Sequence, residues 1–465
     1  MTTNYLIIGN GAAGATAAET IRQRDGQGRI TIVSPEPYPM YSRPGLAYVA
    51  TGEIPPQQVL ARTAEWYTQQ QIERVLGEAV QLDVAGKRVG LGDGRFLPYD
   101  RLLIATGARA VPPPYPGGEL DGVVYLDTLD GTKHLLQKAR RARRAVVIGG
   151  GITALEMVEG LAAQGVETHY LVRGDSLWGK VFNEAESRLV EEKMHHHGVI
   201  IHYRTEVSEI LGNWRGKVRA VRLKSGEELK CDLFGVAIGV KPHLNWLKGS
   251  PISMERAILV DEFLQTNVPD VYAAGDCAQV WDRWTEQYLQ DVLWPSAVAQ
   301  GRAAGLNMVS QVARPGGRPQ QDQRTPYQKG TPFNVCLLFG LHITVIGQIN
   351  PSREAEDEFA EVQAMSRGSS QVWFTFPRHY SSAWSAQGAN TLRLVLAGDR
   401  LVGALIVGEQ STADALRALI EHEVNVAVLR PFLQAESEVL KREIMKMWET
   451  GDWRLETCQS PISSL

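Results

Sequence analysis

The sequence predicts an α/β protein of three domains: two three-layer domains, each with a parallel sheet between helices, and a C-terminal α+β domain. Three observations support this fold class. A strand–helix–strand pattern occurs twice, about 140 residues apart, which is typical of parallel sheets. Each copy has a glycine-rich turn between its first strand and its helix. The length of 465 residues exceeds one ordinary core and suggests about three domains.

Composition narrows the class of protein further. With 44% hydrophobic and 22% charged residues, the chain resembles ordinary globular proteins. Its net charge of -4 gives no basic footprint for nucleic acid or an acidic membrane surface. We find no apolar run of roughly 18 residues and no signal-peptide pattern at the N-terminus, so we expect a cytoplasmic protein without a transmembrane segment.

The first repeat begins with an apolar strand over residues 4–9, a helix from Ala12 to Arg24 and a strand from Arg29 to Ser34. The turn reads GNGAAG, a full G-x-G-x-x-G motif. Its glycines permit a tight turn, the approach of a pyrophosphate and close helix–strand packing, and the anion lies at the helix N-terminus. The pattern predicts a Rossmann-type dinucleotide site that includes Gly9, Gly11, Ala12, Ala13 and Gly14.

The second repeat has strands over 144–149 and 167–173 and a helix over 153–164. Its turn, GGGITA, has alanine at the third motif position, which the motif allows. An acid at the Val172 position would bind the ribose of NADH, whereas an arginine would accept the 2′-phosphate of NADPH. Position 172 is not acidic and an arginine follows it, so we expect Arg173 to favour NADPH over NADH. The alternative is that Arg173 is merely solvated. The cofactor-binding candidates of this domain are Gly149, Gly151, Ile152, Thr153, Glu156, Arg173 and Gly239.

Breaks in the pattern indicate the domain boundaries. The proline-rich segment 112–118 and a second crossover near 240–242 connect the two repeats, and 313–319 is a connector. The third domain has strand patterns over 333–348, 371–376 and 391–407 and helix patterns over 411–424 and 432–448. The expected domains are 1–112 with 242–320, then 113–241, then 328–465.

Residues 266–276, TNVPDVYAAGD, are the most specific motif of the chain. A strand ends at Ala274, Gly275 permits close backbone approach, and Asp276 is left to accept hydrogen bonds from a polyol. The segment resembles the second FAD motif of the pyridine nucleotide–disulfide oxidoreductase superfamily. In that family the matching aspartate holds the ribityl chain of the flavin. The resemblance implies FAD in the first domain and NAD or NADP in the second.

Three further segments support the resemblance. LLIATG at 102–107 is similar to the strand that returns the chain to the second domain, and 294–302 is similar to a helix whose N-terminus faces the flavin. Residues 38–44 resemble the flavin-side loop of the rubredoxin, ferredoxin and nitrite reductase branch. The implied FAD contacts are Arg43, Pro44, Ala105, Thr106, Gly107, Gly275, Asp276, Pro295 and Ala297.

Two acidic residues carry further expectations. The ribose-binding acid at the end of the second strand is replaced by Ser34-Pro35, and Glu36 is the nearest substitute. The family counterpart of Glu156 lies beside the flavin and nicotinamide, often paired with a lysine. Here Tyr48 stands at the lysine position and Arg43 is the nearby cation, so Glu156 and Arg43 are the candidate catalytic residues.

Missing cysteines define the subclass. No cysteine precedes Cys231, so the thiolate that disulfide reductases need near the flavin is absent. Other conspicuous residues are expected to be structural. Cys277 is expected to be a packing residue. His195, His196 and His197 point in different directions around a helix end, so no metal site is expected. Trp281, Trp284, Tyr288 and Trp294 are interpreted as core or dimer packing, with an acceptor lining as the alternative.

The resemblance implies an enzyme that transfers hydride from NAD(P)H to FAD and then electrons to an acceptor. The leading hypothesis is a small redox protein of the rubredoxin or ferredoxin type. An NAD(P)H oxidase, a quinone or small-molecule reductase, and a flavin-bound assembly or redox-sensing subunit are the alternatives. As far as residues 401–405 the C-terminal region resembles the interface domain of the family, which predicts a homodimer.

Overall fold

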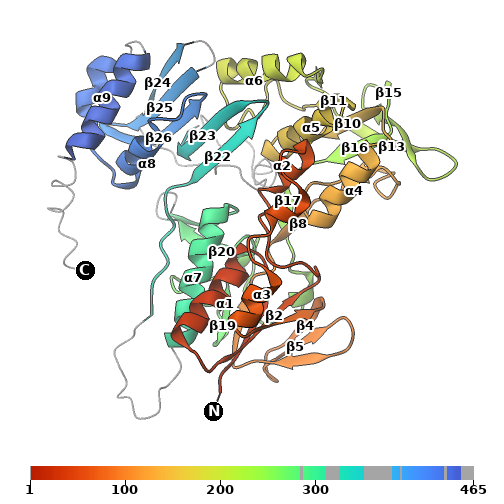
Figure 1. Ribbon diagram of the computed structural model, residues 1–465, viewed down its shortest axis with the longest axis vertical. Helices are drawn as coiled ribbons and strands as arrows, with labels where there is room; N and C mark the ends of the chain where they lie inside the picture. Colours follow the sequence, from red (N-terminus) through yellow and green to blue (C-terminus); the bar gives the residue numbers. More distant parts are fainter. Residues whose placement is uncertain are drawn as a thin grey trace. The chain divides into compact units, whose positions relative to one another are not determined.

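The computed structural model describes residues 2–282, 286–310, 324–349, 380–387, 390–433 and 437–451. The chain divides into two compact units (Figure 1). The first contains residues 1–111, 125–133 and 240–329, and the second contains residues 112–124, 134–239 and 330–465. Because each unit is assembled from separate segments, residues far apart in the sequence meet within it.

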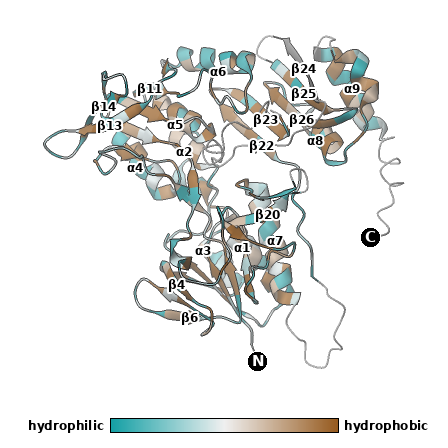
Figure 2. Ribbon diagram, turned by 180° about the vertical axis from the view of Figure 1, so that it is seen from behind, coloured by the Kyte–Doolittle hydropathy of each residue, from teal (hydrophilic) through white to brown (hydrophobic). Residues whose placement is uncertain are grey.

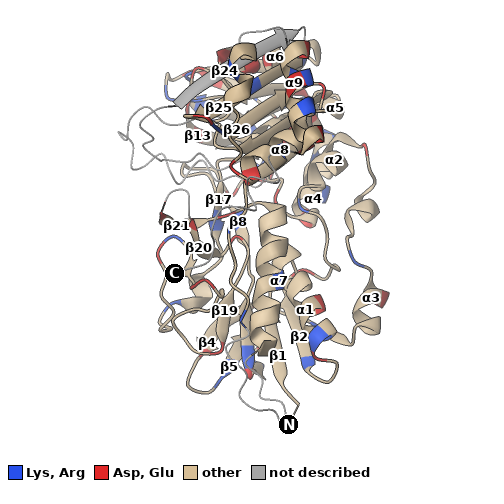
Figure 3. Ribbon diagram, turned by 90° about the vertical axis from the view of Figure 1, so that its left-hand side faces the viewer, with Lys and Arg blue, Asp and Glu red and all other residues tan. Residues whose placement is uncertain are grey.

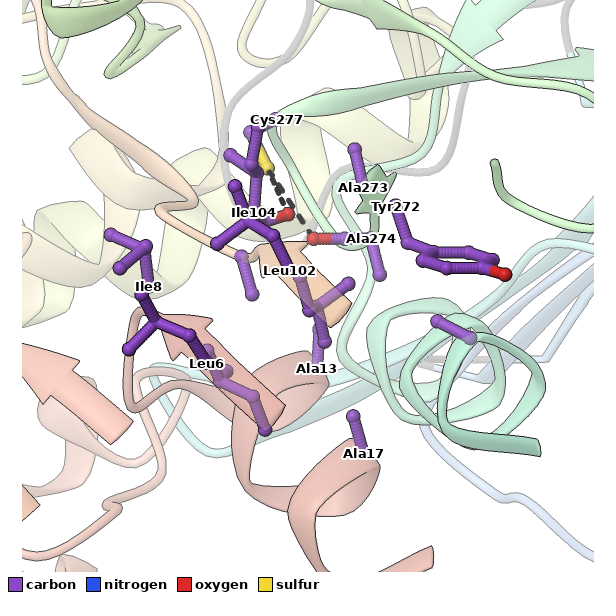
Figure 4. Close-up of a cluster of buried hydrophobic side chains, with 14 of the residues drawn as sticks. Leu6, Ile8, Ala13, Ala17, Leu102, Ile104, Tyr272, Ala273, Ala274 and Cys277 are labelled. Carbon is purple, nitrogen blue, oxygen red and sulfur yellow. Dashed lines mark hydrogen bonds between the residues drawn. The ribbon is translucent and has the colours of Figure 1, made fainter. Parts of the chain in front are cut away.

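The first unit is built around a parallel sheet of strand order β19-β7-β1-β2-β3. Its strands are β1 (Asn4–Ile8), β2 (Arg29–Ser34), β3 (Ile72–Leu76), β7 (Arg101–Ile104) and β19 (Val271–Ala273). The central strands are apolar and buried on both faces, as parallel sheets between covering layers require. Figure 4 shows how Leu6, Leu102 and Tyr272 from three of these strands lie in one core.

Two helices of this unit approach each other closely. α1 (Ala12–Arg24) and α7 (Trp294–Ser310) meet at small residues: a Cβ added to Gly301 would lie 2.2 Å from the carbonyl oxygen of Ala13. α7 is almost free of charged residues in Figure 3, as expected for a helix packed between neighbours.

The remaining elements of the first unit are short. They are α2 (Leu46–Thr51), η1 (Pro56–Val59), α3 (Ala64–Gln69), β4 (Ala79–Asp83), β5 (Arg88–Leu91), β6 (Phe96–Pro98), β8 (Ala108–Ala110), α4 in its first part (Leu129–Ala139), β17 (Val240–Pro242), η2 (Asn245–Leu247), β18 (Ile258–Leu259), β20 (Ala278–Asp282) and β21 (Gln287–Gln290). The second predicted crossover, near 240–242, forms β17, which pairs in antiparallel register with β8, just before the proline-rich segment 112–118.

The second unit repeats the parallel sheet with the order β12-β11-β10-β16-β9. Its elements here are β9 (Val123–Val124), β10 (Arg144–Ile148), α5 (Ile152–Ala163), β11 (Glu167–Leu171), α6 (Glu184–His196), β12 (Ile200–His202) and β16 (Leu233–Val236), with β13 (Val207–Gly212), β14 (Val218–Leu223) and β15 (Glu228–Lys230) in an antiparallel sheet. The order β16-β10-β11 matches β7-β1-β2 of the first unit. The predicted α/β class with two Rossmann-type sheets is therefore confirmed.

The C-terminal part of the second unit is an antiparallel sheet with helices, as the α+β prediction states. Its elements are β22 (Phe333–Leu338), β23 (Leu341–Gly347), β24 (Tyr380–Gln387), β25 (Asn390–Ala397), β26 (Arg400–Val407), α8 (Ala413–Glu421), η4 (Ala427–Phe432) and α9 (Ser437–Thr450). The expected strand over 371–376 and the connector over 313–319 lie outside the described residues. In Figure 2 the described strands of this sheet are largely apolar, whereas α6 carries many polar residues.

A buried ion pair joins this sheet to α6. Arg393 of β25 donates from Nε and Nη2 to the two carboxylate oxygens of Glu186, at 2.9 and 3.0 Å. The guanidinium also donates to the carbonyl oxygens of Val181 and of Ile349, the latter at 2.8 Å. Glu186 itself closes the capping box of α6 with Asn183. One arginine thus connects the N-terminus of α6 with the C-terminal sheet.

Among the described residues, none of the helices combines the length and the apolar character that crossing a bilayer requires.

Candidate dinucleotide sites

The first glycine turn has the geometry of an anion cradle. Gly9 has a φ of +118°, and a Cβ there would lie 2.0 Å from the carbonyl oxygen of Ala105. A Cβ on Gly14 would lie 2.0 Å from the Gly9 carbonyl oxygen, whereas one on Gly11 meets nothing within 4 Å. Gly11 caps α1 without a side-chain hydrogen bond, and the first turn has no acid. Its N–H groups are therefore oriented for a pyrophosphate, and the residues fit FAD.

The second turn repeats this geometry in the second unit. Gly149 has a φ of +146°, and its Cβ would lie 2.2 Å from the carbonyl oxygen of Ala237. Gly150, the variable residue of this motif, has open space, and Gly151 caps α5 without a side-chain hydrogen bond and with no acid in the first turn. Gly239, with a φ of +113°, follows Ala237 just beyond the end of β16. This turn fits the pyrophosphate of a nicotinamide dinucleotide.

Three predicted FAD segments meet at Gly275. A Cβ added there would lie 3.2 Å from Ala13 of α1 and 3.9 Å from Ala297 of α7. The structure thus brings together the first glycine turn, the Gly275-Asp276 turn and the first turn of α7, which also contains Pro295. Ala105, Thr106 and Gly107 follow β7 beside the same turn, since the Ala105 N–H donates to the Ile8 carbonyl oxygen at 2.8 Å.

Two glutamines hold the Gly275-Asp276 turn and were not predicted. The Gly275 N–H donates to Gln300 Oε1 at 2.7 Å, and Gln290 Nε2 donates to the Asp276 carbonyl oxygen at 2.8 Å. Both side chains are buried. Gln300 lies in the segment 294–302 that resembles the family's flavin-facing helix, but its contact with Gly275 was not predicted; Gln290 lies outside the motifs.

A buried tyrosine connects the first glycine turn with the flavin-side loop. The Tyr67 hydroxyl donates to Asn10 Oδ1 at 2.8 Å and accepts from the Met40 N–H at 3.0 Å. Asn10 Nδ2 in turn donates to the Tyr38 carbonyl oxygen at 3.2 Å. These bonds fix the variable residue of the G-x-G turn, and sequence reasoning missed them because Tyr67 lies on α3, outside any motif.

Glu36 and Arg43 bind each other. Arg43 donates to Glu36 Oε1 at 2.6 Å, and the Tyr41 hydroxyl donates to Oε2 at 2.5 Å. Burial alone would raise the pKa of the Glu36 carboxyl, but the Arg43 charge and these hydrogen bonds lower it overall. Arg43 also donates to the Asp127 carbonyl oxygen at 2.7 Å, and Pro44 is exposed. Binding of the adenosine ribose by Glu36 and of the flavin by Arg43 stay predictions. A ribose bound to Glu36 would share its carboxylate with Arg43 and Tyr41.

Glu156 is placed on α5, one helical turn beyond Ile152 and Thr153. Burial, together with the charge of Glu159, raises its pKa to about 8. The role of Glu156 beside the flavin and nicotinamide stays a prediction. Tyr48, at the expected lysine position, lies on α2 of the first unit.

Arg173 lies beyond the end of β11, with an exposed side chain, and follows the buried Val172. Val172 holds the position at which an acid would bind the ribose of NADH, and the role of Arg173 towards a 2′-phosphate stays a prediction. Asp175, the next acid, binds Arg204.

The other singled-out residues have structural contacts. Cys277 is fully buried, and its Sγ donates to the carbonyl oxygens of Ile104 and Ala274 (Figure 4). His197, at the end of α6, packs against Phe339 with 5.2 Å between ring centroids. Trp281 and Tyr288 form an exposed cross-strand pair, and Trp284 lies outside the described residues. In the part of the chain that the structure describes, no group of three potential metal ligands occurs.

Comparison with known proteins identifies the class. The pyridine nucleotide-disulphide oxidoreductase family matches residues 3–301. NAD(P)H nitrite reductase of Bacillus subtilis is 25% identical over 92% of this chain and 49% of its own length. NADH-dependent phenylglyoxylate dehydrogenase subunit epsilon of Aromatoleum evansii is 30% identical over 74% of this chain and 79% of the subunit. Rubredoxin-NAD(+) reductase of Pseudomonas putida is 31% identical over 59% of this chain and 71% of that protein.

Among solved structures, the covalent putidaredoxin reductase–putidaredoxin complex matches with a TM-score of 0.80 at 22% identity, over 96% of this chain and 99% of that one. The fold and both glycine turns define a protein with two dinucleotide-binding sites of the Rossmann type. The chain belongs to the pyridine nucleotide-disulphide oxidoreductase family. It spans about half of the nitrite reductase that it matches.

Proposed function

We propose that this protein accepts hydride from NAD(P)H on FAD and passes the electrons to a small redox protein of the rubredoxin or ferredoxin type. The observation that carries the proposal is the pair of glycine turns that lead into α1 and α5, where Gly11 and Gly151 cap the helices without a side-chain hydrogen bond and with no acid in the first turn. Bound FAD supplies the chemistry, because it accepts a hydride and can release single electrons. The chain's own residues position the dinucleotides and exclude water. The similarity to rubredoxin-NAD(+) reductase supports the acceptor class.

A flavin titration tests this function. The purified chain is expected to retain FAD and to lose its yellow absorbance on anaerobic addition of NADPH or NADH. Stopped-flow reoxidation is then measured with rubredoxin, ferredoxin, a quinone and oxygen. Reoxidation by oxygen as fast as by any carrier would favour an oxidase, and flavin that neither nucleotide reduces would favour an assembly or sensing subunit.

Replacement of Arg173 by alanine is expected to lower kcat/KM for NADPH by about 10–100-fold and to leave the value for NADH nearly unchanged. The reason is the loss of a charge-assisted bond to the 2′-phosphate, which contributes about 1.5–3 kcal/mol. Steady-state kinetics with both nucleotides measure the ratio. Arg188→Ala, at an exposed arginine of α6, is the matched control. Equal losses with NADH and NADPH would contradict the specificity role.

The proposal also covers the oligomeric state and the location of the protein. The family resemblance supports a homodimer formed through the C-terminal domain. It also supports a cytoplasmic enzyme. Sedimentation velocity over a concentration series would detect the dimer, and a monomer at micromolar concentration would contradict it.

A further inference from the structure

The turn that follows β19 depends on other elements for its hydrogen bonds. Gly275, Asp276 and Cys277 lie beyond Ala273, the last residue of β19 that pairs with β7. Gly275 has a φ of +82°, and a Cβ added there would lie 3.2 Å from the Cβ of Ala13 on α1. The backbone of the turn is therefore packed against a helix, and its polar groups need partners from outside the sheet.

Three consecutive peptide groups of this turn are bound. The Gly275 N–H donates to Gln300 Oε1 at 2.7 Å. The Gly275 carbonyl oxygen accepts from the Ala278 N–H at 2.9 Å, and the Asp276 carbonyl oxygen accepts from Gln290 Nε2 at 2.8 Å. Because each peptide group is planar, binding all three fixes the backbone dihedral angles of residues 275 and 276. The direction in which the Asp276 side chain leaves the backbone is fixed with them.

The two glutamines that bind the turn are shielded from solvent. Gln300 is fully buried and Gln290 is 7% exposed, so water does not replace either hydrogen bond readily. Gln300 lies on α7, and the next residue, Gly301, packs against the backbone of Ala13. One stretch of α7 thus holds both the Gly275 turn and the first turn of α1, which follows the glycine motif.

We propose that Gln300 and Gln290 are positioning residues: together they orient the Asp276 carboxylate, which the family resemblance assigns to the ribityl chain of FAD. The proposal rests on the proposed function in that FAD occupies the first dinucleotide site. Neither glutamine has to touch the cofactor, because each acts through the backbone of the turn. A carboxylate that points elsewhere would lose its hydrogen bonds to the polyol, and FAD would then dissociate faster.

The rate of FAD release from the flavin-loaded full chain tests the proposal. The protein is diluted, and release is followed as the rise in fluorescence of free flavin. Gln300→Met and Gln290→Met are each expected to accelerate release by about 10-fold or more, because methionine has a similar length but cannot bind a peptide group. If Gln300→Met fails to fold, Gln290→Met still tests the other side of the turn.

Gln279→Met is the matched control for a purely structural effect. Gln279 is 3% exposed and pairs with Gln290 across the β20–β21 hairpin. Its amide accepts from the Ala257 N–H at 2.7 Å and donates to the Tyr288 carbonyl oxygen at 3.2 Å, so it binds residues outside the turn. Its replacement is expected to lower the melting temperature about as much as Gln290→Met does, with FAD released at nearly the wild-type rate. Equal acceleration in Gln279→Met and Gln290→Met would overturn the proposal.

A double-mutant cycle identifies the group through which the glutamines act. In the Asp276→Ala background the carboxylate is absent, so adding Gln290→Met is expected to change FAD release little further. Both backgrounds are loaded with saturating FAD before dilution. A Gln290→Met effect as large in the Asp276→Ala background as in the wild type would mean that the glutamine does not act through this carboxylate, and would refute the positioning role.

These measurements involve neither a nicotinamide nucleotide nor an electron acceptor. Slow FAD release from the wild type, combined with a flavin that neither NADPH nor NADH reduces, would count against the proposed function alone. Unchanged release in both Gln300→Met and Gln290→Met would count against the positioning role alone.

Discussion

Gly9→Ala is expected to produce a protein that neither folds stably nor retains FAD. Alanine would have to adopt a φ of +118°, and its Cβ would lie 2.0 Å from the carbonyl oxygen of Ala105, a backbone atom next to a central strand. Backbone strain and overpacking together should destabilise the fold by about 3–5 kcal/mol. Thermal denaturation and the ratio of flavin to protein absorbance after purification measure both effects.

Two other glycines make this test specific. Gly11→Ala has no atom within 4 Å of the new Cβ, so it should fold normally but lose about 10–100-fold in FAD affinity, since the methyl group occupies the place of the pyrophosphate. Gly26→Ala also has open space, but it is far from the motif in sequence and should behave as the wild type. If Gly11→Ala retained FAD as tightly as Gly26→Ala, the cradle would be assigned to the wrong atoms.

Arg393→Met is expected to lower the free energy of unfolding by about 3–5 kcal/mol, because it leaves the Glu186 carboxylate buried without its partner. The carboxylate of Glu186 is fully buried and the arginine side chain is 6% exposed, so water cannot replace the lost bonds. Chemical denaturation of the FAD-loaded protein measures the change. The loss should be largest for the C-terminal sheet and α6, and proteolysis of that region should accelerate.

Arg400→Met is the matched control, because that arginine is 60% exposed and binds Glu423 on the surface. Surface pairs of this kind contribute about 1 kcal/mol or less. A double replacement of Arg393 and Glu186 by leucine or methionine should recover part of the lost stability, since no charge is left buried. Equal stabilities of Arg393→Met and Arg400→Met would contradict the assigned role of the buried pair.

Local patterns predicted the parts of the fold that depend on neighbouring residues. Gly9, Gly11 and Gly149 are recognisable because a strand, a turn and a helix follow one another within a few residues. The contacts of Glu36 were not predictable in the same way. Its partners Arg43 and Tyr41 are near in sequence, but only the fold of the flavin-side loop directs them to both of its oxygens.

Long-range contacts were beyond the sequence patterns. Arg393 and Glu186 are 207 residues apart, and Phe339 and Glu159 are 180 residues apart. Each pair joins the C-terminal domain to a helix of the second Rossmann-type domain. None of these four residues belongs to a recognised motif.

The position of β19 has a consequence for synthesis of the chain. Val271, Tyr272 and Ala273 pair with Leu102, Leu103 and Ile104, so β7 keeps an open hydrogen-bonding edge until the ribosome has added about 170 further residues. Non-local pairing of this kind slows folding and exposes the nascent chain to association with other strands. We expect the N-terminal half alone to bind chaperones or to aggregate, and FAD to associate only after the C-terminal part of its domain has emerged.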